Sequence, residues 1–257
     1  MNVFATTSWK MRVATNLPLV LENICKQDYK LDSIQVYLSL DEFPNRENDL
    51  PKRLLELKEI DKRIEYIWTK GNLKSFKRLL SIKNNPNCNL CIYDDDTIHG
   101  RDWLRTGFSQ LALNGYVNLS GWIGLTCESR DLKYKMNYMY KNKYPNYFNC
   151  SQGYFLQTKN YRNIDLDFEL PVKLGINDDD YYFHMINVVN HIKSAPLTYL
   201  GKKKLITSPT DMRNSVYTHK AVLEYWRDNE KSKFDEYFKI KEDTVKWLPV
   251  IKKVELT

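Results

Sequence analysis

Short apolar segments alternate with amphipathic ones through residues 1–96, and this alternation constrains the fold more than any other feature. The segments 3–8 and 34–38 have the length and composition of buried strands. The stretch between them repeats apolar residues every three or four positions, as one face of a helix does. A strand, a helix and a strand in succession form a βαβ unit with parallel strands, and residues 64–68 extend the series. The sequence therefore predicts an α/β fold in which helices flank a mostly parallel central sheet.

A fourth apolar run, residues 90–93, ends abruptly in three consecutive carboxylates, Asp94, Asp95 and Asp96. Three carboxylates at a strand end repel one another and are costly to hold together unless a cation or hydrogen-bond donors lie among them. Mg2+ and Mn2+ are bound by such oxygen clusters, usually with nucleotide phosphates completing the shell. We therefore expect a metal–nucleotide site here. The alternative, from these residues alone, is an Asp-rich turn that caps the helix beginning near Arg101.

Polar residues also fall where other predicted strands end. Thr7, Asp41 and Asp94 occupy such positions, and ligands of open α/β sheets bind at the carboxyl ends of the parallel strands. The chain has neither G-x-G-x-x-G nor G-x-x-x-x-G-K-[ST], the glycine-rich loops that bind phosphates through backbone amides. A nucleotide in this half would be held by carboxylates and a metal ion.

A second acidic cluster, Asp178, Asp179 and Asp180, precedes a stretch with helical apolar spacing up to residue 192. Projected onto that helix, Asp178 falls on the buried stripe, Asp179 at its edge and Asp180 on the far side. Carboxylates at a helix start are favoured by the helix dipole, so N-capping is one interpretation. One cap needs one acid, however, and three acids suggest a second acidic site that faces the first.

The composition is that of a globular protein whose net charge suits an anionic partner, with a solvated basic surface as the alternative for any single lysine. With 42% hydrophobic and 13% aromatic residues, the chain is not disordered throughout. The net charge of +7 suits a nucleotide, an anionic membrane surface or a nucleic acid. No run approaches the roughly 18 apolar residues of a membrane span, and no signal-peptide pattern is visible, so a cytoplasmic location is expected.

The amino-acid composition and the apolar spacing change after residue 130. Residues 131–147 are rich in Lys, Asn, Tyr and Met without a clean period, and we interpret them as the join between a nucleotide-binding half, 1–130, and a second half, 131–257. Aromatic residues stand beside lysines in the tail, at Phe234, Tyr237, Phe238 and Trp247. They would either touch a bilayer interface or pack on the body, and we favour packing.

Five motifs occur in order along residues 3–192: TTSWKMR, IQVYLSLDEF, CIYDDDTIHGRDWL, GYFLQTK and NDDDYYF. Together they resemble the GT-A glycosyltransferases with a DxD motif, and within them the family-2-like bacterial enzymes that elaborate surface polysaccharides. The resemblance implies a single Rossmann-like GT-A domain whose residues 131–257 bind the acceptor. It also implies metal-dependent, inverting transfer of a hexose or N-acetylhexosamine from a nucleotide-sugar, such as a UDP-sugar, with Mn2+ or Mg2+.

The acceptor would be a hydroxyl of an oligosaccharide or lipid-linked glycan in polysaccharide biosynthesis, and no nucleic acid would take part. This activity suits a cytoplasmic enzyme that is peripheral at the inner face of the membrane. The donor sugar, the linkage and the oligomeric state stay open.

Carried over by position, the resemblance assigns the donor-binding residues. Thr6 or Thr7, with Arg12, would line the base and phosphate end of the donor. Asp41 would meet the base, and Asp94 would contact the ribose.

The resemblance also places charges around the diphosphate. Asp96 would bind the metal ion, and His219 stands where many relatives have a further metal ligand, although ordinary packing is the alternative for a lone His. Lys74 or Arg78, close to the polar face of a helix predicted over 73–82, would add positive charge from the other side. The expected donor-binding set is Thr6, Thr7, Arg12, Asp41, Lys74, Arg78, Asp94 and Asp95, and the expected metal ligands are Asp94, Asp96 and His219.

The motif NDDDYYF stands where inverting members keep a catalytic base ahead of a helix. A carboxylate there would take the proton from the acceptor hydroxyl as it attacks the anomeric carbon. The helix projection favours Asp178 or Asp179. The alignment with the family motif can shift by one residue, so the choice among the three acids stays open.

Two other functions are compatible with parts of the sequence. A sugar nucleotidyltransferase would share the scaffold, but residues 8–12 lack the glycine-rich loop typical of that class. A non-enzymatic binder of glycans or nucleic acid would use the tyrosines and lysines of 131–147 for stacking. Two carboxylate triplets would repel a phosphate backbone, which disfavours the nucleic-acid binder.

Overall fold

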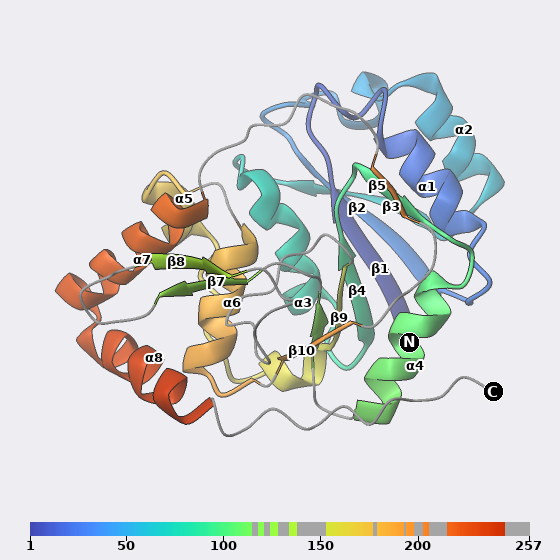
Figure 1. The fold of residues 1–257 in the computed structure, drawn as a ribbon. Helices are drawn as coiled ribbons and strands as arrows, with labels where there is room; N and C mark the ends of the chain where they lie inside the picture. Colours follow the sequence, from blue (N-terminus) through green and yellow to red (C-terminus); the bar gives the residue numbers. More distant parts are fainter. Residues whose placement is uncertain are drawn as a thin grey trace.

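A seven-stranded sheet crosses the middle of the protein and carries helices on both faces (Figure 1). The computed structural model describes residues 1–114, 118–120, 124–127, 134–137, 153–176, 179–192, 194–197, 203–205 and 215–244. The strands lie in the order β10-β6-β9-β4-β1-β2-β3. They are β1 (Asn2–Thr7), β2 (Ser33–Ser39), β3 (Ile64–Thr69), β4 (Asn89–Tyr93), β6 (Asn118–Ser120), β9 (Tyr154–Gln157) and β10 (Ser194–Pro196).

The four strands of the amino-terminal half run parallel, as the βαβ pattern predicts. β1 pairs with β2 on one side and β4 on the other, and β3 extends the sheet beyond β2. β9 runs antiparallel between β4 and β6, and β10 is parallel to β6. Thr7 pairs with Tyr37 and Thr6 with Tyr93, so the carboxyl ends of the three central strands are nearly level. The expected mostly parallel α/β architecture is confirmed, and the loops after β1, β2 and β4 leave the sheet at one edge.

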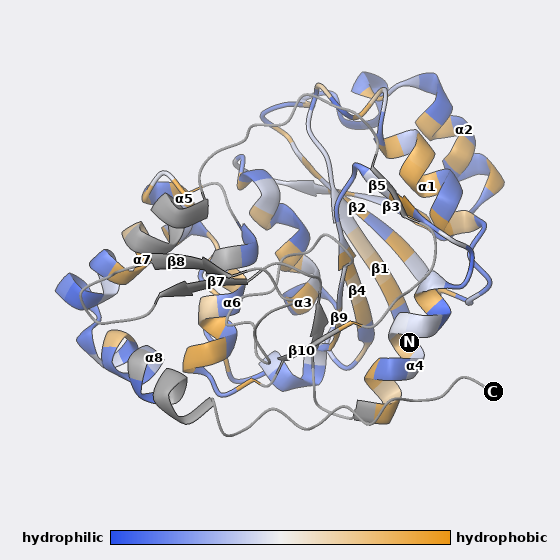
Figure 2. Cartoon of the chain, viewed as in Figure 1, coloured by the Kyte–Doolittle hydropathy of each residue, from blue (hydrophilic) through white to orange (hydrophobic). Residues whose placement is uncertain are grey.

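Each face of the sheet has its own apolar cluster. Val3 and Ala5 of β1 belong to one cluster and Phe4 to the other, because successive strand residues point to opposite faces. The elements α1 (Leu17–Cys25), α2 (Lys52–Ile60) and α4 (Trp103–Asn114) pack on the Phe4 side, while α3 (Leu80–Asn84), α6 (Asp179–Val189), α7 (Ser215–Asn229) and α8 (Lys231–Thr244) pack on the other. Figure 2 shows hydrophobic residues along β1 and β4 between these layers. Burial on both faces explains the unbroken apolar runs of these strands.

The segment after β3 is a 3-10 helix, η2 (Lys74–Leu79), which continues as the short helix α3. The α-helix predicted over residues 73–82 is therefore wrong in its first half. Lys74 has a φ of 52°, outside the range of a right-handed helix, so regular winding begins only after it. The neighbours Lys77 and Arg78 both turn inward and are buried. The expectation that Arg78 lies near a polar face is also wrong.

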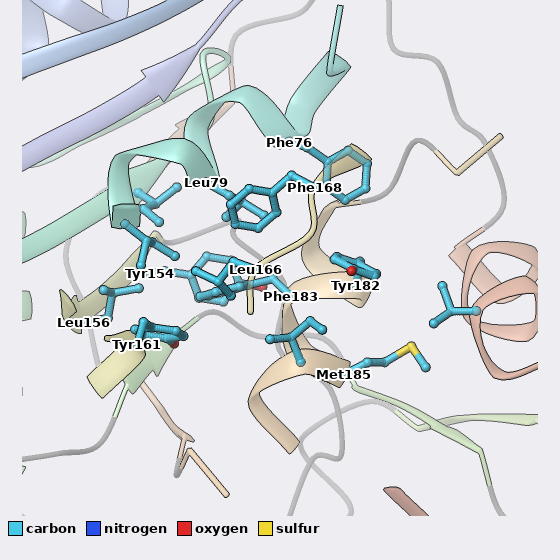
Figure 3. Packing of buried hydrophobic residues seen from close by; sticks show 14 of the residues in the cluster. Phe76, Leu79, Tyr154, Leu156, Tyr161, Leu166, Phe168, Tyr182, Phe183 and Met185 are labelled. Atoms are coloured by element: carbon cyan, nitrogen blue, oxygen red, sulfur yellow. The ribbon is translucent and has the colours of Figure 1, made fainter. Parts of the chain in front are cut away.

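Aromatic side chains fasten α6 to η2 and to β9 (Figure 3). Phe76 of η2 meets Tyr182 of α6 edge to face, with ring centroids 5.8 Å apart. Phe183, one residue further along α6, packs against Tyr154 of β9 at 5.2 Å and stacks on Tyr161 at 5.6 Å. These contacts fix the beginning of α6 beside η2, although the two segments are far apart in the sequence.

Two short strand pairs lie outside the main sheet. One pairs β7 (Gly124–Cys127) with β8 (Tyr134–Asn137). β5 (Thr97–His99) follows the acid turn and pairs with β11 (Lys203–Leu205), a contact that no local pattern predicts.

The described part of the tail packs on the body, as favoured from the sequence. Phe234 and Tyr237 of α8 are buried in the cluster that also holds Trp226 of α7. The side chain of Phe238 and all of Trp247 lie outside the described part of the chain. Among the described residues, no helix combines the length and the apolar character needed to cross a membrane. The division at residue 130 stays a prediction.

Replacing Phe183 by Ala should lower the free energy of unfolding by about 3–5 kcal/mol, because it removes a fully buried ring from the cluster that holds α6. Ile60→Ala is the control, because Ile60 lies on the apolar stripe of α2 in the sequence yet is 82% exposed. Its truncation should change stability by less than about 0.5 kcal/mol. Urea denaturation followed by circular dichroism measures both, and equal losses would contradict the packing of α6 described here.

Candidate functional site

The three carboxylates after β4 differ in exposure. The side chain of Asp94 is 32% exposed, that of Asp96 15% and that of Asp95 only 7%. They follow the carboxyl end of a central strand, at the edge where the loops after β1 and β2 also leave the sheet. The turn therefore offers Asp94 and Asp96 to a ligand and keeps Asp95 inside.

Asp95 anchors the loop after β1 to this acid turn. One of its oxygens accepts a 2.5 Å hydrogen bond from Ser8 Oγ, and the other lies 2.8 Å from Arg12 Nη1. The same nitrogen of Arg12 lies 3.1 Å from Asp96 Oδ2. Burial raises the pKa of Asp95, while Arg12 and Ser8 act in the opposite direction. A contact between Asp95 and a nucleotide stays a prediction, and its place in the structure favours an anchoring role.

Asp96 lies close to both a negatively and a positively charged side chain. Burial, and then the negative charge of Asp94, raise the pKa of Asp96, against the attraction of Arg12. Its Oδ1 accepts a hydrogen bond of 3.1 Å from Thr97 Oγ1, which leaves the carboxylate oriented beside Asp94. Two oriented carboxylates that repel each other are suited to a shared cation.

Arg78 brings the second acidic cluster against the first. Its Nη1 donates a hydrogen bond to Asp94. Its Nε lies 2.7 Å from Asp179 Oδ2 and its Nη2 lies 3.0 Å from Asp179 Oδ1, a two-point contact. The Nη2 also lies 3.2 Å from Asp180 Oδ1. The clusters at the end of β4 and the start of α6 thus meet on one guanidinium group.

The polar residues at the other strand ends differ in availability. Thr6 is fully buried, and its hydroxyl donates a 3.0 Å hydrogen bond to the carbonyl of Tyr93. Thr7 is half-buried and donates to the carbonyl of Tyr37 at 2.7 Å. Asp41 is exposed. Thr7 and Asp41 therefore lie where a ligand can reach them, whereas the hydroxyl of Thr6 is hydrogen-bonded to the backbone of β4.

Lys77, with Glu42 and Asn72, is the part of this edge that sequence reasoning missed. Its Nζ lies 3.2 Å from Asn72 Oδ1 and 3.5 Å from Glu42 Oε2, and burial lowers its pKa while Glu42 opposes the shift. The helix predicted over residues 73–82 gave no reason to turn Lys77 inward. The side chain of Lys74, by contrast, is exposed, although its backbone N–H donates a 2.9 Å hydrogen bond to the same Asn72 Oδ1.

Two expected site residues cannot be placed. Asp178 lies outside the described residues, and His219 falls on α7 with its side chain outside the described set. Among the described side chains, no group of three or more His, Cys, Asp or Glu has the geometry to hold a metal ion by itself. Asp94 and Asp96 could hold a divalent ion only with further ligands, such as phosphate oxygens.

Comparison with known proteins identifies the fold. No protein-family model matches the chain, and no curated protein matches it by sequence. Among solved structures, S. aureus TarS 1–349 in complex with UDP matches with a TM-score of 0.55 and 11% identity, over 96% of this chain and 72% of that one. The same fragment in complex with UDP-GlcNAc matches with a TM-score of 0.54 and 12% identity, over 94% and 72%.

A third solved structure also matches over most of the chain. The mannosyltransferase PcManGT from Pyrobaculum calidifontis, in complex with GDP-Man and Mn2+, matches with a TM-score of 0.53 and 12% identity, over 93% of this chain and 68% of that one. The chain has the GT-A fold. At this level of identity the likeness establishes the fold and leaves the activity to be argued from the site.

Replacing Asp95 by Ala should destabilise the protein by about 3 kcal/mol, because it leaves the buried end of Arg12 with one carboxylate fewer and releases Ser8. Asp41→Ala, at an exposed acid of the same edge, should change stability by less than about 0.5 kcal/mol. Urea denaturation of the two variants distinguishes the anchoring acid from the exposed one. A loss for Asp95→Ala no larger than that for Asp41→Ala would contradict the anchor.

Proposed function

We propose that the protein is a metal-dependent, inverting glycosyltransferase that moves a sugar from a UDP-sugar to a hydroxyl group of a glycan. The observation that carries the proposal is the meeting of two acidic clusters on Arg78 at the carboxyl edge of a parallel sheet. Proteins of the same fold are described in complex with UDP, UDP-GlcNAc, and GDP-Man with Mn2+, which supports a nucleotide-sugar donor.

The donor would lie over the ends of β1, β2 and β4, where open α/β sheets bind ligands. Thr7 and Asp41 are available there, and Asp94 is the most exposed of the three acids after β4. Arg12 lies beside Asp95 and Asp96, close enough to the acid turn to face a phosphate. These residues would bind the base, ribose and phosphate parts of the donor in that order along the edge.

The charges of the site fit a divalent cation. Asp94, Asp95, Asp96, Asp179 and Asp180 are bridged by two arginines, which leaves three more negative than positive charges among these seven side chains when all are ionised. Asp94 and Asp96 would hold Mn2+ or Mg2+, with His219 as a further candidate ligand. The bound ion would neutralise charge on the leaving diphosphate as a Lewis acid.

Asp180 is the proposed proton acceptor. Asp179 is 6% exposed and held by a two-point contact, so its oxygens are committed to Arg78. Asp180 is 16% exposed, and its Oδ1 lies 3.2 Å from Arg78 Nη2, so it is the more accessible of these two acids to a hydroxyl group. As that hydroxyl attacks the anomeric carbon, Asp180 takes its proton and the bond to the diphosphate breaks. Of the two acids that the structure describes, the greater exposure of Asp180 supports this choice, although the helix projection placed Asp180 on the far side.

The scope of the activity follows the same reasoning. The donor sugar would be a hexose or an N-acetylhexosamine, and the acceptor an oligosaccharide or lipid-linked glycan of polysaccharide biosynthesis, bound mainly by residues 131–257. The net charge of +7 would favour peripheral contact with an anionic membrane surface on the cytoplasmic side.

Calorimetric titration of UDP should show binding that depends on Mn2+, because the site carries excess negative charge. Asp96→Ala should weaken the Mn2+-dependent part of that binding and lower kcat/KM by at least about 100-fold. Binding of UDP that is equally tight without metal, together with unchanged turnover in Asp96→Ala, would overturn the proposed role of the acid turn.

Asp180→Asn should lower kcat by about 10²–10⁴-fold with donor affinity unchanged, because the amide cannot accept the proton but keeps the shape of the side chain. Steady-state kinetics with saturating donor and UDP titration measure the two quantities. Glu169→Gln, at an exposed acid away from the site, is the control and should behave as wild type. Wild-type turnover in Asp180→Asn would exclude Asp180 as the base.

A further inference from the structure

Arg78 is an unusual residue for its position. Its side chain is 4% exposed, yet it keeps a full positive charge and meets three carboxylates. Taking a charge out of water costs several kcal/mol per ion, and the cost is offset only by close, well-oriented partners. A buried ion cluster is therefore weak evidence for stability. It indicates instead that the three carboxylates must be held at fixed positions relative to one another.

Four contacts join the guanidinium group to acids of the protein. Its planar fork makes the two-point contact with Asp179, while Nη1 turns to Asp94 and Nη2 also reaches Asp180. Both edges of the group thus face acids of the chain itself. A diphosphate bound directly by Arg78, as expected from the sequence, would have to compete with these acids for the guanidinium group.

The segment around Arg78 is held by a local hydrogen bond and by a contact with α6, the helix that carries the acids. Ser81 Oγ donates a 2.5 Å hydrogen bond to the carbonyl of Arg78. Phe76, two residues before Arg78, packs edge to face on Tyr182, two residues after Asp180 (Figure 3). The apolar contact and the ionic contact therefore hold the same two short segments together from adjacent points.

We propose that Arg78 is a positioning residue that holds Asp180 at a fixed place relative to Asp94. It would keep the proton acceptor and the donor site in register. This inference rests on the proposed function. Arg78 acts through Asp179, whose two-point contact orients the first turn of α6 and with it the neighbouring Asp180. Without the guanidinium, three carboxylates would repel one another and the start of α6 would move away from the acid turn.

Lysine cannot reproduce this arrangement, because its ammonium group is a point charge without the planar fork. Arg78→Lys should lower kcat by about 100-fold, the scale of a misplacement of about 1 Å in a reacting geometry. The donor KM and the Kd of UDP should stay within about threefold of wild type. Arg63→Lys is the matched control, because Arg63 makes a similar two-point contact with Asp61. Both residues precede β3, whereas the site lies beyond the carboxyl ends of the strands. The replacement should leave kcat, the donor KM and the Kd of UDP unchanged.

A double variant separates positioning from an independent effect. If Arg78 acts through Asp179, Arg78→Lys combined with Asp179→Asn should lose little more than the worse single variant, whereas independent effects multiply. Should Arg78→Lys fail to fold, Asp179→Asn alone asks the same question, since it removes the charge and keeps the shape of the two-point contact. It should lower kcat at least about tenfold with the donor KM unchanged.

The outcomes distinguish the two proposals. A wild-type protein that binds no UDP and transfers no sugar from any nucleotide-sugar refutes the proposed function and this inference with it. An active wild type in which Arg78→Lys weakens UDP binding tenfold or more, with kcat retained, refutes this inference alone and makes Arg78 a donor contact. Multiplying losses in the double variant, or full kcat in both single variants, refute it as well.

Discussion

Repulsion among five carboxylates at one edge of the sheet is the constraint on which the site depends. Two unit charges 4 Å apart interact by about 4 kcal/mol at the effective dielectric of a partly buried site. The net stability of a domain is only about 5–15 kcal/mol, so one uncompensated pair would remove a large part of it. Arg12 and Arg78 supply the compensation, and each does so from a different part of the chain. Among the described residues, these two arginines make the ion pairs that hold the acids of this edge together.

The two arginines each connect a different pair of segments. Arg12 ties the loop after β1 to the acid turn after β4, two segments that the parallel pairing of their strands already places side by side. Arg78 joins the acid turn to α6, a contact that sheet pairing does not provide. The aromatic packing of Phe183 on Tyr154 and Tyr161 supplies the apolar burial that holds α6 in place. Packing thus brings α6 close, and the guanidinium sets its final orientation.

The sequence predicted the features that follow from local periodicity. The parallel strands, the flanking helices and the polar strand ends at Thr7, Asp41 and Asp94 all follow from residue patterns of strand or helix length. Ile60 shows the limit of this reasoning, because it continues the apolar spacing of α2 in the sequence yet is 82% exposed in the described part of the chain. The left-handed backbone of Lys74 left no signal in the sequence, so the 3-10 helix and the inward turn of Lys77 and Arg78 could not be anticipated.

The acids of α6 show a second limit. A helix projection sorts side chains by the direction of their Cβ atoms, and it placed Asp180 away from the core. Arg78 reaches both Asp179 and Asp180, because a long side chain from a neighbouring segment can span the first turn of a helix. The orientation of Asp180 is therefore a tertiary property that depends on η2, and periodicity within α6 alone does not contain it.

The charge distribution also bears on the alternative functions. The chain carries +7 overall, while the edge that we propose binds the donor has an excess of negative charge. A polyanion without a tightly bound cation, such as single-stranded nucleic acid, would meet repulsion at that edge. A nucleoside diphosphate that arrives with a divalent ion brings charge of both signs, and the ion can lie between its phosphates and the carboxylates. The local field thus favours a metal–diphosphate complex, and the positive charge elsewhere stays available for the acceptor or for an anionic surface.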